Sequence, residues 1–220
     1  MSHSYTASVE DYVKAIYELS RRSGAASSSD VAARLAVARP SVSAMVGRLA
    51  EQGLVTHERH QGLKLTKAGR AVALRLIRRH RVIEAYLVTA LGYTWDQVHD
   101  EAERLEHTAS DDLVNRMARA IDEPDVDPHG APIPTTRGTV AEQASRSLDE
   151  LAAGEEARVV RVEDDDAEFL RYLASLKLVP GAAVRLIGRE PFGGPLAIRV
   201  GTRTHRVGPT LAARVFVAQV

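Results

Sequence analysis

Cysteine is absent from this sequence of 220 residues, and its absence excludes disulfide bonds, zinc–thiolate sites and thiol catalysis. No stretch approaches the run of about 18 apolar residues that a transmembrane helix needs, so we expect no membrane span. Residues Met1–Ser8 lack a basic region followed by an apolar run, so we expect no signal peptide. These absences together predict a cytoplasmic protein without a membrane partner.

An excess of one charge is also missing. The 29 Lys and Arg residues balance 29 Asp and Glu residues, so no overall field favours nucleic acid or a membrane surface. The neutral total conceals a local asymmetry, however. Residues 1–73 hold ten basic and six acidic residues, a net charge of +4, whereas residues 95–128 hold three basic and eleven acidic residues, a net charge of −8. This asymmetry predicts an anionic partner for the first segment and a cationic one for the second.

The first third of the chain has the pattern of a winged helix-turn-helix. Ser8 is the expected N-cap of a first helix, and Asp30–Ala36 forms a short second helix. A third helix begins at Pro40 and ends before Gly53. The segments Leu54–Glu58 and Leu63–Thr66 follow as two short strands. Helix, short helix, turn, helix and hairpin in this order are typical of a DNA-binding head.

The exposed side of the third helix carries small or basic residues and no acid, so it can approach a duplex closely. Basic residues on the hairpin suit contacts to phosphate. We therefore predict the DNA-binding residues Arg39, Pro40, Ser41, Ser43, Ala44, Arg48, Arg59 and Lys64. The alternative is that this helix-turn-helix is a packing module only.

The remainder of the chain divides into a helical part and a β part. A long helix from Thr66 to about Ala90 and two further helices have more apolar surface than one small domain covers, which indicates a homodimer. Five short strands after Leu148 indicate a small β-barrel. We expect a mainly α protein with a small β part: a winged helix-turn-helix (1–73), a helical metal-binding and dimerisation domain (74–144) and an SH3-like barrel (145–220).

One short segment of the helical part, residues 99–107, concentrates potential metal ligands. Read as a helix, it places His99, Glu103, Glu106 and His107 on one side. Two imidazoles and two carboxylates on a small area suit a divalent cation. The glutamates of this segment also have a simpler interpretation as solvated helix residues. Outside the segment, Asp11 is explained as the acid of the Ser8 cap, and His80 with Glu84 as an ion pair. Three of the eight histidines lie four residues from a glutamate on a predicted helix, which favours the metal site. The other five, His129 among them, receive no metal role.

Five segments, in this order and spacing, carry a family resemblance: Val9–Leu19, Pro40–Ser43, Leu65–Arg70, Arg79–Arg81 with Glu84, and Val98–His107. They are similar to the diphtheria toxin repressor family of metal-dependent transcriptional regulators, whose longer members end in an SH3-like domain. The resemblance implies a primary metal site and an ancillary one. The primary site consists of Asp11, Glu103, Glu106 and His107, and the ancillary site of His80, Glu84, His99, Asp165 and Glu168.

The resemblance also bears on the metal. Iron-responsive members place Met and Cys where this chain has Asp11 and Glu103, whereas manganese-responsive members use carboxylates there. Hard oxygen ligands suit Mn²⁺. The short manganese regulators carry a further glutamate where this chain has Lys14, so their two-manganese cluster is not copied here. We expect Mn²⁺ at two sites per subunit, with Fe²⁺ as the alternative.

The function predicted from these features is a manganese-dependent repressor that binds a palindromic operator as a homodimer and controls metal homeostasis. One alternative is an iron-dependent regulator of the same family. Another is a helical di-metal enzyme, since Glu103-x-x-Glu106-His107 resembles known ligand motifs. The sequence shows no nucleophile motif and no phosphate loop, so we expect neither an enzyme nor a small organic substrate. A metal-independent DNA-binding protein is the third alternative.

Overall fold

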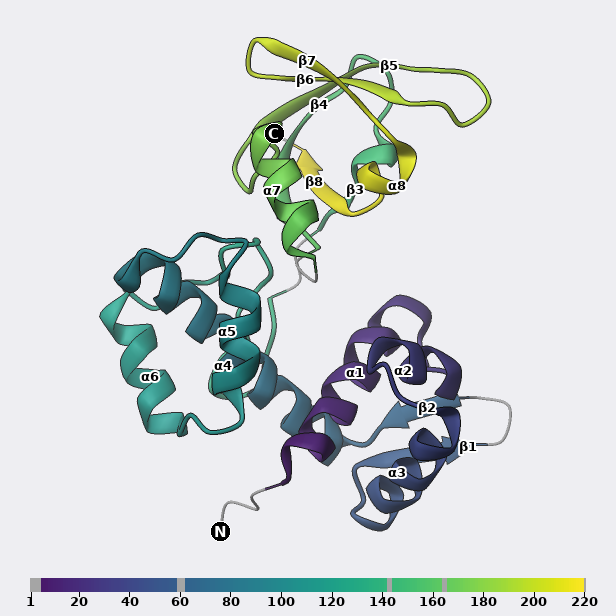
Figure 1. Cartoon of the computed structure of the whole chain (residues 1–220), viewed down its shortest axis with the longest axis vertical. Coiled ribbons are helices and arrows are strands. Elements are labelled where there is room, and N and C mark those ends of the chain that lie inside the picture. Colours follow the sequence, from purple (N-terminus) through teal and green to yellow (C-terminus); the bar gives the residue numbers. More distant parts are fainter. Residues whose placement is uncertain (1–4, 59–61, 142–143, 164–165, 220) are drawn as a thin grey trace. The chain divides into compact units, whose positions relative to one another are not determined.

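The computed structural model describes residues 5–58, 62–141, 144–163 and 166–219 (Figure 1). The chain forms two compact units. Unit 1 comprises Met1–His80, Glu106–Ala109 and Pro134–Thr139, and unit 2 comprises Arg81–Leu105, Ser110–Ile133 and Val140–Val220. Among the described residues, no helix has both the length and the apolar character needed to cross a bilayer.

Unit 1 contains the winged helix-turn-helix. Its elements are α1 (Ala7–Ser23), α2 (Ser28–Arg34), α3 (Arg39–Glu51) and an antiparallel hairpin of β1 (Val55–Glu58) and β2 (Gly62–Leu65). Apolar residues at helical spacing on α1 and α3 form its core; Val13, Ile16, Val42 and Leu49 are all fully buried. The order of elements confirms the predicted fold.

The start of α1 differs from the prediction. The N-cap is Thr6, whose hydroxyl accepts a hydrogen bond from the backbone N–H of Val9 at 3.4 Å, so Ser8 is the second residue of the helix. Asp11 therefore lies beyond the first turn. The interpretation of Asp11 as the acid of the cap is wrong, which leaves its carboxylate to be explained by what it faces.

The helical part follows with α4 (Lys67–Leu91), α5 (Val98–Glu106) and α6 (Asp111–Ala120). Thr66 caps α4, where the sequence predicts that the long helix begins, and Ser110 caps α6. Four apolar residues at helical spacing on α4 are buried: Leu74, Ile77, Ile83 and Leu87. Helix α5 ends at Glu106, so His107 lies in the turn that follows rather than on the helix.

The C-terminal part of unit 2 is a six-stranded antiparallel sheet with the order β3-β8-β4-β5-β6-β7. Its elements are β3 (Arg146–Ser147), η1 (Leu148–Glu150), β4 (Glu156–Val162), α7 (Ala167–Ser175), β5 (Ala183–Arg189), β6 (Leu196–Val200), β7 (Arg203–Val207), α8 (Pro209–Ala212) and β8 (Val215–Gln219). The five predicted strands are confirmed. Strand β3, η1 and α8 are additional, and each is too short to produce a periodic pattern.

Candidate metal centres and DNA-binding face

A carboxylate–imidazole group, here called the Asp11 centre, joins α1 to the end of α5. It consists of Asp11, Glu106 and His107, whose potential ligand atoms all lie within 4.8 Å of one another. His107 Nε2 lies 2.9 Å from Asp11 Oδ1 and 3.7 Å from Glu106 Oε1. Two carboxylates and one imidazole nitrogen facing the same point form a donor set that fits a hard divalent cation.

Glu10 orients the histidine of this centre. Its Oε2 lies 2.8 Å from His107 Nδ1. With Nδ1 donating its proton to Glu10, Nε2 would be available to coordinate an ion beside Asp11 and Glu106. The sequence prediction omits Glu10. Its position beside Asp11 is the available signal, but adjacent residues of a helix are rotated by about 100° from each other, so helical spacing does not group them.

Glu106 is the buried member of the Asp11 centre. Its side chain has no solvent exposure, and Lys14 Nζ donates to Oε1 at 3.0 Å and to Oε2 at 3.1 Å. His80 Nδ1 lies 2.6 Å from Oε2. The negative charge of Glu106 is thus compensated within unit 1, and Lys14 lies against the centre instead of on the protein surface. His80, predicted for the ancillary site, contacts the primary carboxylate here.

Glu103 belongs to unit 2. Within that unit its partly exposed carboxylate lies 4.0 Å from His99 Nε2. His99 in turn places Nδ1 3.4 Å from Glu84 Oε1. The predicted pairing of Glu84 with His99 thus has structural support, whereas the role of Glu103 as a ligand of the Asp11 centre stays a prediction.

A second carboxylate–imidazole group, here called the Glu84 centre, lies entirely in unit 2. Glu84, Asp127 and His129 are buried, and their potential ligand atoms lie within 4.8 Å of one another. Neither Asp127 nor His129 was predicted as a ligand. The only sequence signal was an Asp and a His two residues apart in a proline-rich loop, and no periodicity relates that loop to α4.

Hydrogen bonds fix the geometry of the Glu84 centre. Asp127 Oδ1 accepts from the backbone N–H groups of His129 and Ala131, both at 2.9 Å. His129 Nε2 lies 2.7 Å from the Trp95 carbonyl oxygen. Because a carbonyl only accepts, Nε2 carries a proton, and Nδ1 lies 3.7 Å from Glu84 Oε2. An imidazole nitrogen and carboxylate oxygens at these distances are ligand types that suit a divalent cation.

The predicted ligands from the barrel gain no structural support. Glu168 is exposed in the first turn of α7 and joins neither centre among the described residues. Asp165 lies outside the described residues. Strand β4 does approach the Glu84 centre, since Val162 donates its backbone N–H to the His129 carbonyl at 2.9 Å.

The predicted DNA-binding face is exposed on α3. The six residues predicted there, from Arg39 to Arg48, are all exposed, whereas Val42, Val46 and Leu49 on the opposite side are buried. Lys64 is exposed on β2, and Arg59 lies outside the described residues. The face is thus available to a duplex, and its DNA contacts stay a prediction.

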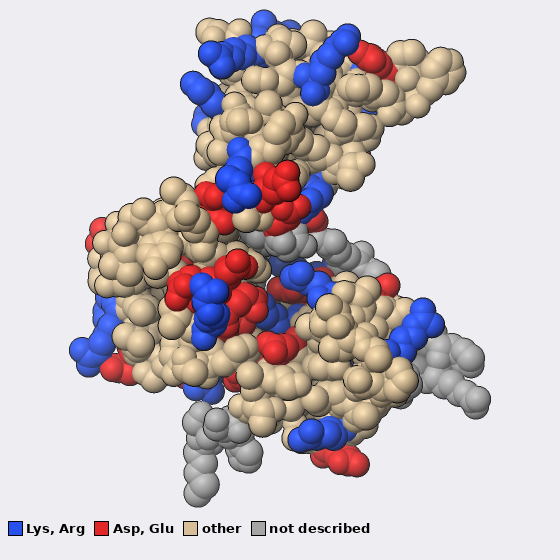
Figure 2. Space-filling view, viewed as in Figure 1, with Lys and Arg blue, Asp and Glu red and all other residues tan. Residues whose placement is uncertain are grey.

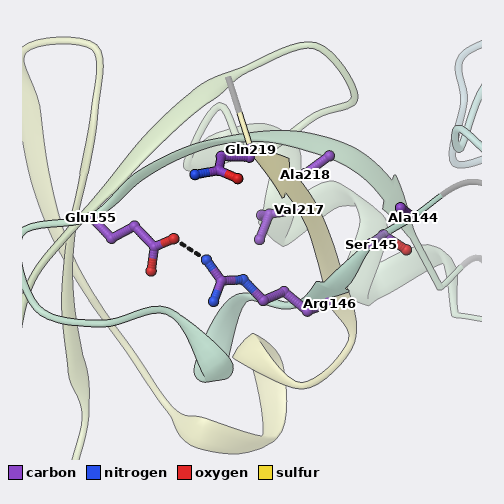
Figure 3. A pocket seen from close by; sticks show the side chains of 7 residues that line it. All are labelled: Ala144, Ser145, Arg146, Glu155, Val217, Ala218 and Gln219. Atoms are coloured by element: carbon purple, nitrogen blue, oxygen red, sulfur yellow. Dashed lines mark hydrogen bonds and ion pairs between the residues drawn. The ribbon is translucent and has the colours of Figure 1, made fainter.

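A shallow pocket of about 440 Å³ lies at the β3–β8 edge of the barrel (Figure 3). Arg146 and Glu155 face each other across it and form an ion pair. Their mutual neutralisation leaves the pocket without a net charge, and neither metal centre contributes a residue to it.

A winged helix-turn-helix followed by helices with buried carboxylate–imidazole groups defines a class of metal-responsive DNA-binding protein. Three family models match the chain in succession. Residues 4–63 match the iron dependent repressor N-terminal DNA binding domain, residues 66–135 match the iron dependent repressor metal binding and dimerisation domain, and residues 146–219 match the FeoA domain.

Relatives match over almost the whole chain. The iron-dependent repressor IdeR of Mycobacterium leprae (strain TN) is 31% identical over 96% of both chains. A solved manganese-dependent transcriptional repressor in complex with manganese is 36% identical, with a TM-score of 0.89, over 96% of this chain and 100% of that one. The manganese regulator SloR is 34% identical, with a TM-score of 0.81, over 96% and 98%.

The chain therefore belongs to the iron-dependent repressor family, that of the diphtheria toxin repressor. It is a metal-dependent transcriptional repressor and not an enzyme, which confirms the predicted class. The two matching family models describe a DNA-binding domain and a dimerisation domain. These domains indicate operator DNA and a second copy of the chain as partners.

Proposed function

We propose that this repressor responds to Mn²⁺, binds a palindromic operator as a metal-activated dimer and controls genes of metal-ion homeostasis in the cytoplasm. The observation that carries the proposal is the oxygen-rich Asp11 centre, with Asp11, Glu106 and His107 within 4.8 Å of one another. The chain has no cysteine, so no thiolate can shift the preference toward softer metals. Similarity to a repressor solved in complex with manganese supports this choice.

Asp11, Glu106 and His107 would hold the ion at the primary site, with Glu103 as the further ligand implied by the family resemblance. The ancillary site would consist of Glu84 and His99, together with Asp127 and His129 from the structure. His80, Asp165 and Glu168 remain candidates from the resemblance. At either site a bound cation supplies positive charge that neutralises neighbouring carboxylates.

Coupling to DNA would arise because the Asp11 centre draws on two elements. Asp11 belongs to α1 of the DNA-binding head, whereas Glu106 and His107 end α5. Holding these side chains together would fix the head and thereby the spacing of the two α3 helices in the dimer, so that both can enter successive major grooves. A coupling of about 1–3 kcal/mol is enough to change operator affinity tens-fold.

The dimer would form through the helical part. Large apolar side chains remain exposed there, and Leu91, Leu105 and Leu113 are 58%, 37% and 45% exposed. Apolar side chains exposed on neighbouring helices mark an interaction surface. We propose the same domain bounds as the sequence predicts: residues 1–73 for the DNA-binding domain, 74–144 for the helical metal-binding and dimerisation domain, and 145–220 for the SH3-like barrel.

An iron-dependent response is the second candidate, because the curated relative from Mycobacterium leprae is named an iron-dependent repressor. The carboxylates of Asp11 and Glu103 favour Mn²⁺ over Fe²⁺, because the resemblance implies Met and Cys at these two positions in iron-responsive members.

The test is a titration of Mn²⁺, Fe²⁺ and Zn²⁺ against binding of a labelled duplex from upstream of the protein's own gene, with a chelator as control. Activation by Mn²⁺ at the lowest free concentration is expected. DNA binding that is unchanged by the chelator would contradict metal dependence, and activation by Fe²⁺ at a lower free concentration than Mn²⁺ would select the iron response.

Replacing Asp11 by Met and Glu103 by Cys together should shift the response toward Fe²⁺. Glu103→Ala with an undiminished Mn²⁺ response would remove Glu103 from the primary site.

A further inference from the structure

The barrel sheet places two arginines directly opposite each other. Arg185 on β5 pairs with Arg199 on β6, and Arg199 pairs with Thr204 on β7. Directly paired residues of antiparallel strands project from the same face, with Cβ atoms about 4.5–5.5 Å apart. Like charges at this separation destabilise a sheet. An anion bound between the two guanidinium groups would remove that repulsion.

Two further arginines extend the same face. Arg158 is two residues from Glu156, which pairs with Arg185, and Arg206 is two residues from Thr204. Residues two apart on a strand share a face, so Arg158, Arg185, Arg199 and Arg206 project together. We call these four residues the arginine face. The other side of the sheet is the barrel core, where Val184, Leu186, Ile198 and Val200 are buried.

Acidic residues compensate this charge only in part. Arg185 lies 3.5 Å from Glu156 and Arg206 lies 2.7 Å from Glu190. Arg199 makes no ion pair with the residues that the structure describes. Residues 183–207 contain five arginines and one acid, a net charge of +4 in a chain of zero net charge. Figure 2 shows separate blue side chains along the upper edge of the barrel, where red is sparse, and both colours at its lower edge.

We propose that the arginine face binds the phosphate backbone of duplex DNA beside the operator, as a second DNA contact in addition to α3. This inference rests on the proposed function, because it requires that the protein binds an operator. Guanidinium groups recognise phosphate by bidentate hydrogen bonds. Protein partners favour surfaces with an apolar or aromatic centre and few charges, whereas nucleic acid favours polar, strongly positive surfaces. The centre of this face is charged, which favours DNA.

A second contact on the same DNA acts at a high effective concentration once the head is bound. It adds affinity only when the duplex extends far enough to reach it. The face also reads no base sequence, because phosphate contacts are independent of sequence. Long fragments should therefore bind more tightly than the minimal operator, whatever the sequence of the added DNA.

The test uses the full-length protein with Mn²⁺ and two duplexes: a minimal operator selected from a random DNA library, and the same operator extended by about two helical turns of arbitrary sequence at each end. Affinity is measured by fluorescence anisotropy over a range of salt concentrations. The parent should bind the long duplex more tightly, with a steeper salt dependence. The variant Arg185→Gln/Arg199→Gln should lower the slope of log K against log salt by about 2 per subunit on the long duplex only.

The matched control is Arg146→Gln/Arg171→Gln, which removes the same charge from two exposed arginines that are paired with Glu155 and Asp96. This control should leave the slope on the long duplex unchanged. Equal slopes for parent and variant on the long duplex, or an equal loss in the control, would overturn the inference and point to a protein partner or a general charge effect. Those outcomes leave operator binding intact, whereas failure of the parent on both duplexes would contradict the proposed function as well.

Discussion

At the level of single residues, the orientation of His107 shows how a neighbouring acid can prepare a metal ligand. Glu10 accepts at Nδ1 and Asp11 lies at Nε2, with distances of 2.8 Å and 2.9 Å. Two adjacent residues of α1 thus bracket one imidazole. The two contacts hold the orientation of the ring before any ion binds, so less ordering remains to be done when the ion binds.

Replacing Glu10 by Ala should therefore weaken Mn²⁺ binding to the free protein by about 10–100-fold, although Glu10 is not itself a predicted ligand. Isothermal titration calorimetry of the DNA-free protein measures this directly. The control is Glu18→Ala on the same helix, which removes a partly buried acid that pairs with Arg34. Equal affinities of parent and Glu10→Ala would show that His107 needs no orienting partner.

Asp96 offers a pH-dependent test at the same scale. Burial raises the pKa of its carboxyl, but hydrogen bonds from Thr94 and Arg171 outweigh that effect and hold the pKa below the ordinary value of 3.8. A carboxyl with a lowered pKa in the folded state stabilises the fold above its ordinary pKa. That contribution is lost as the pH falls through the lowered pKa.

Asp96→Asn should accordingly be less stable than the parent at neutral pH. The gap in urea midpoint should stay constant down to about pH 3.8 and close below it. Arg171→Ala should remove part of the same gap, since Arg171 Nη1 lies 3.2 Å from Asp96 Oδ2. A gap between parent and Asp96→Asn that persists at low pH would assign the effect to packing and not to ionisation.

At the level of elements, the loop that carries Asp127 and His129 depends on one glycine. Gly130 has φ +86°, and a Cβ built there would lie 1.9 Å from the Val160 carbonyl oxygen of β4. Backbone in this region favours glycine, and no flexible side chain is available to move aside. The loop is thus held by backbone contact, and with it the Glu84 centre.

Gly130→Ala should lower the free energy of unfolding by about 2–5 kcal/mol, the sum of backbone strain and steric overlap. Gly154→Ala is the matched control, because Gly154 has φ +87° and open space around its Cβ position. That variant should lose only about 1 kcal/mol. Thermal and urea unfolding measure both values. Equal losses of unfolding free energy in the two variants would show that the close contact between the loop and β4 does not restrict residue 130.

The spacing of apolar residues determined which helices and strands could be predicted from the sequence. The long helices and the five barrel strands were predicted, because each is long enough to repeat its apolar spacing. The prediction was wrong at the start of helix α1, because a single capping hydrogen bond determines where a helix begins. Thr6 and Ser8 are both good caps, and only the backbone at Thr6 takes the extended conformation that a cap requires. Strand β3 and helix α8 have two and four residues and therefore no period to detect.

At the level of the whole molecule, the candidate sites required contacts that spacing does not encode. Residues on one helix face could be grouped from the sequence, and the resemblance supplied Asp11. The Glu84 centre draws on α4 and a proline-rich loop more than 40 positions away, and the structure alone brings them together. Lys14 likewise looked like a missing ligand, yet its ammonium group contacts the buried Glu106.

Metal and DNA should assist each other by the same factor, because coupling between two binding sites is reciprocal. If Mn²⁺ raises operator affinity by about 5–150-fold, saturating operator must lower the free Mn²⁺ needed for half-occupancy by that factor. Equilibrium dialysis with and without the operator measures the second ratio, and anisotropy measures the first. Arg48→Ala, with Arg48 exposed on α3, should bind Mn²⁺ like the parent and lose the effect of DNA on it. Metal affinity that operator leaves unchanged would mean that the Asp11 centre does not link the head to the dimer.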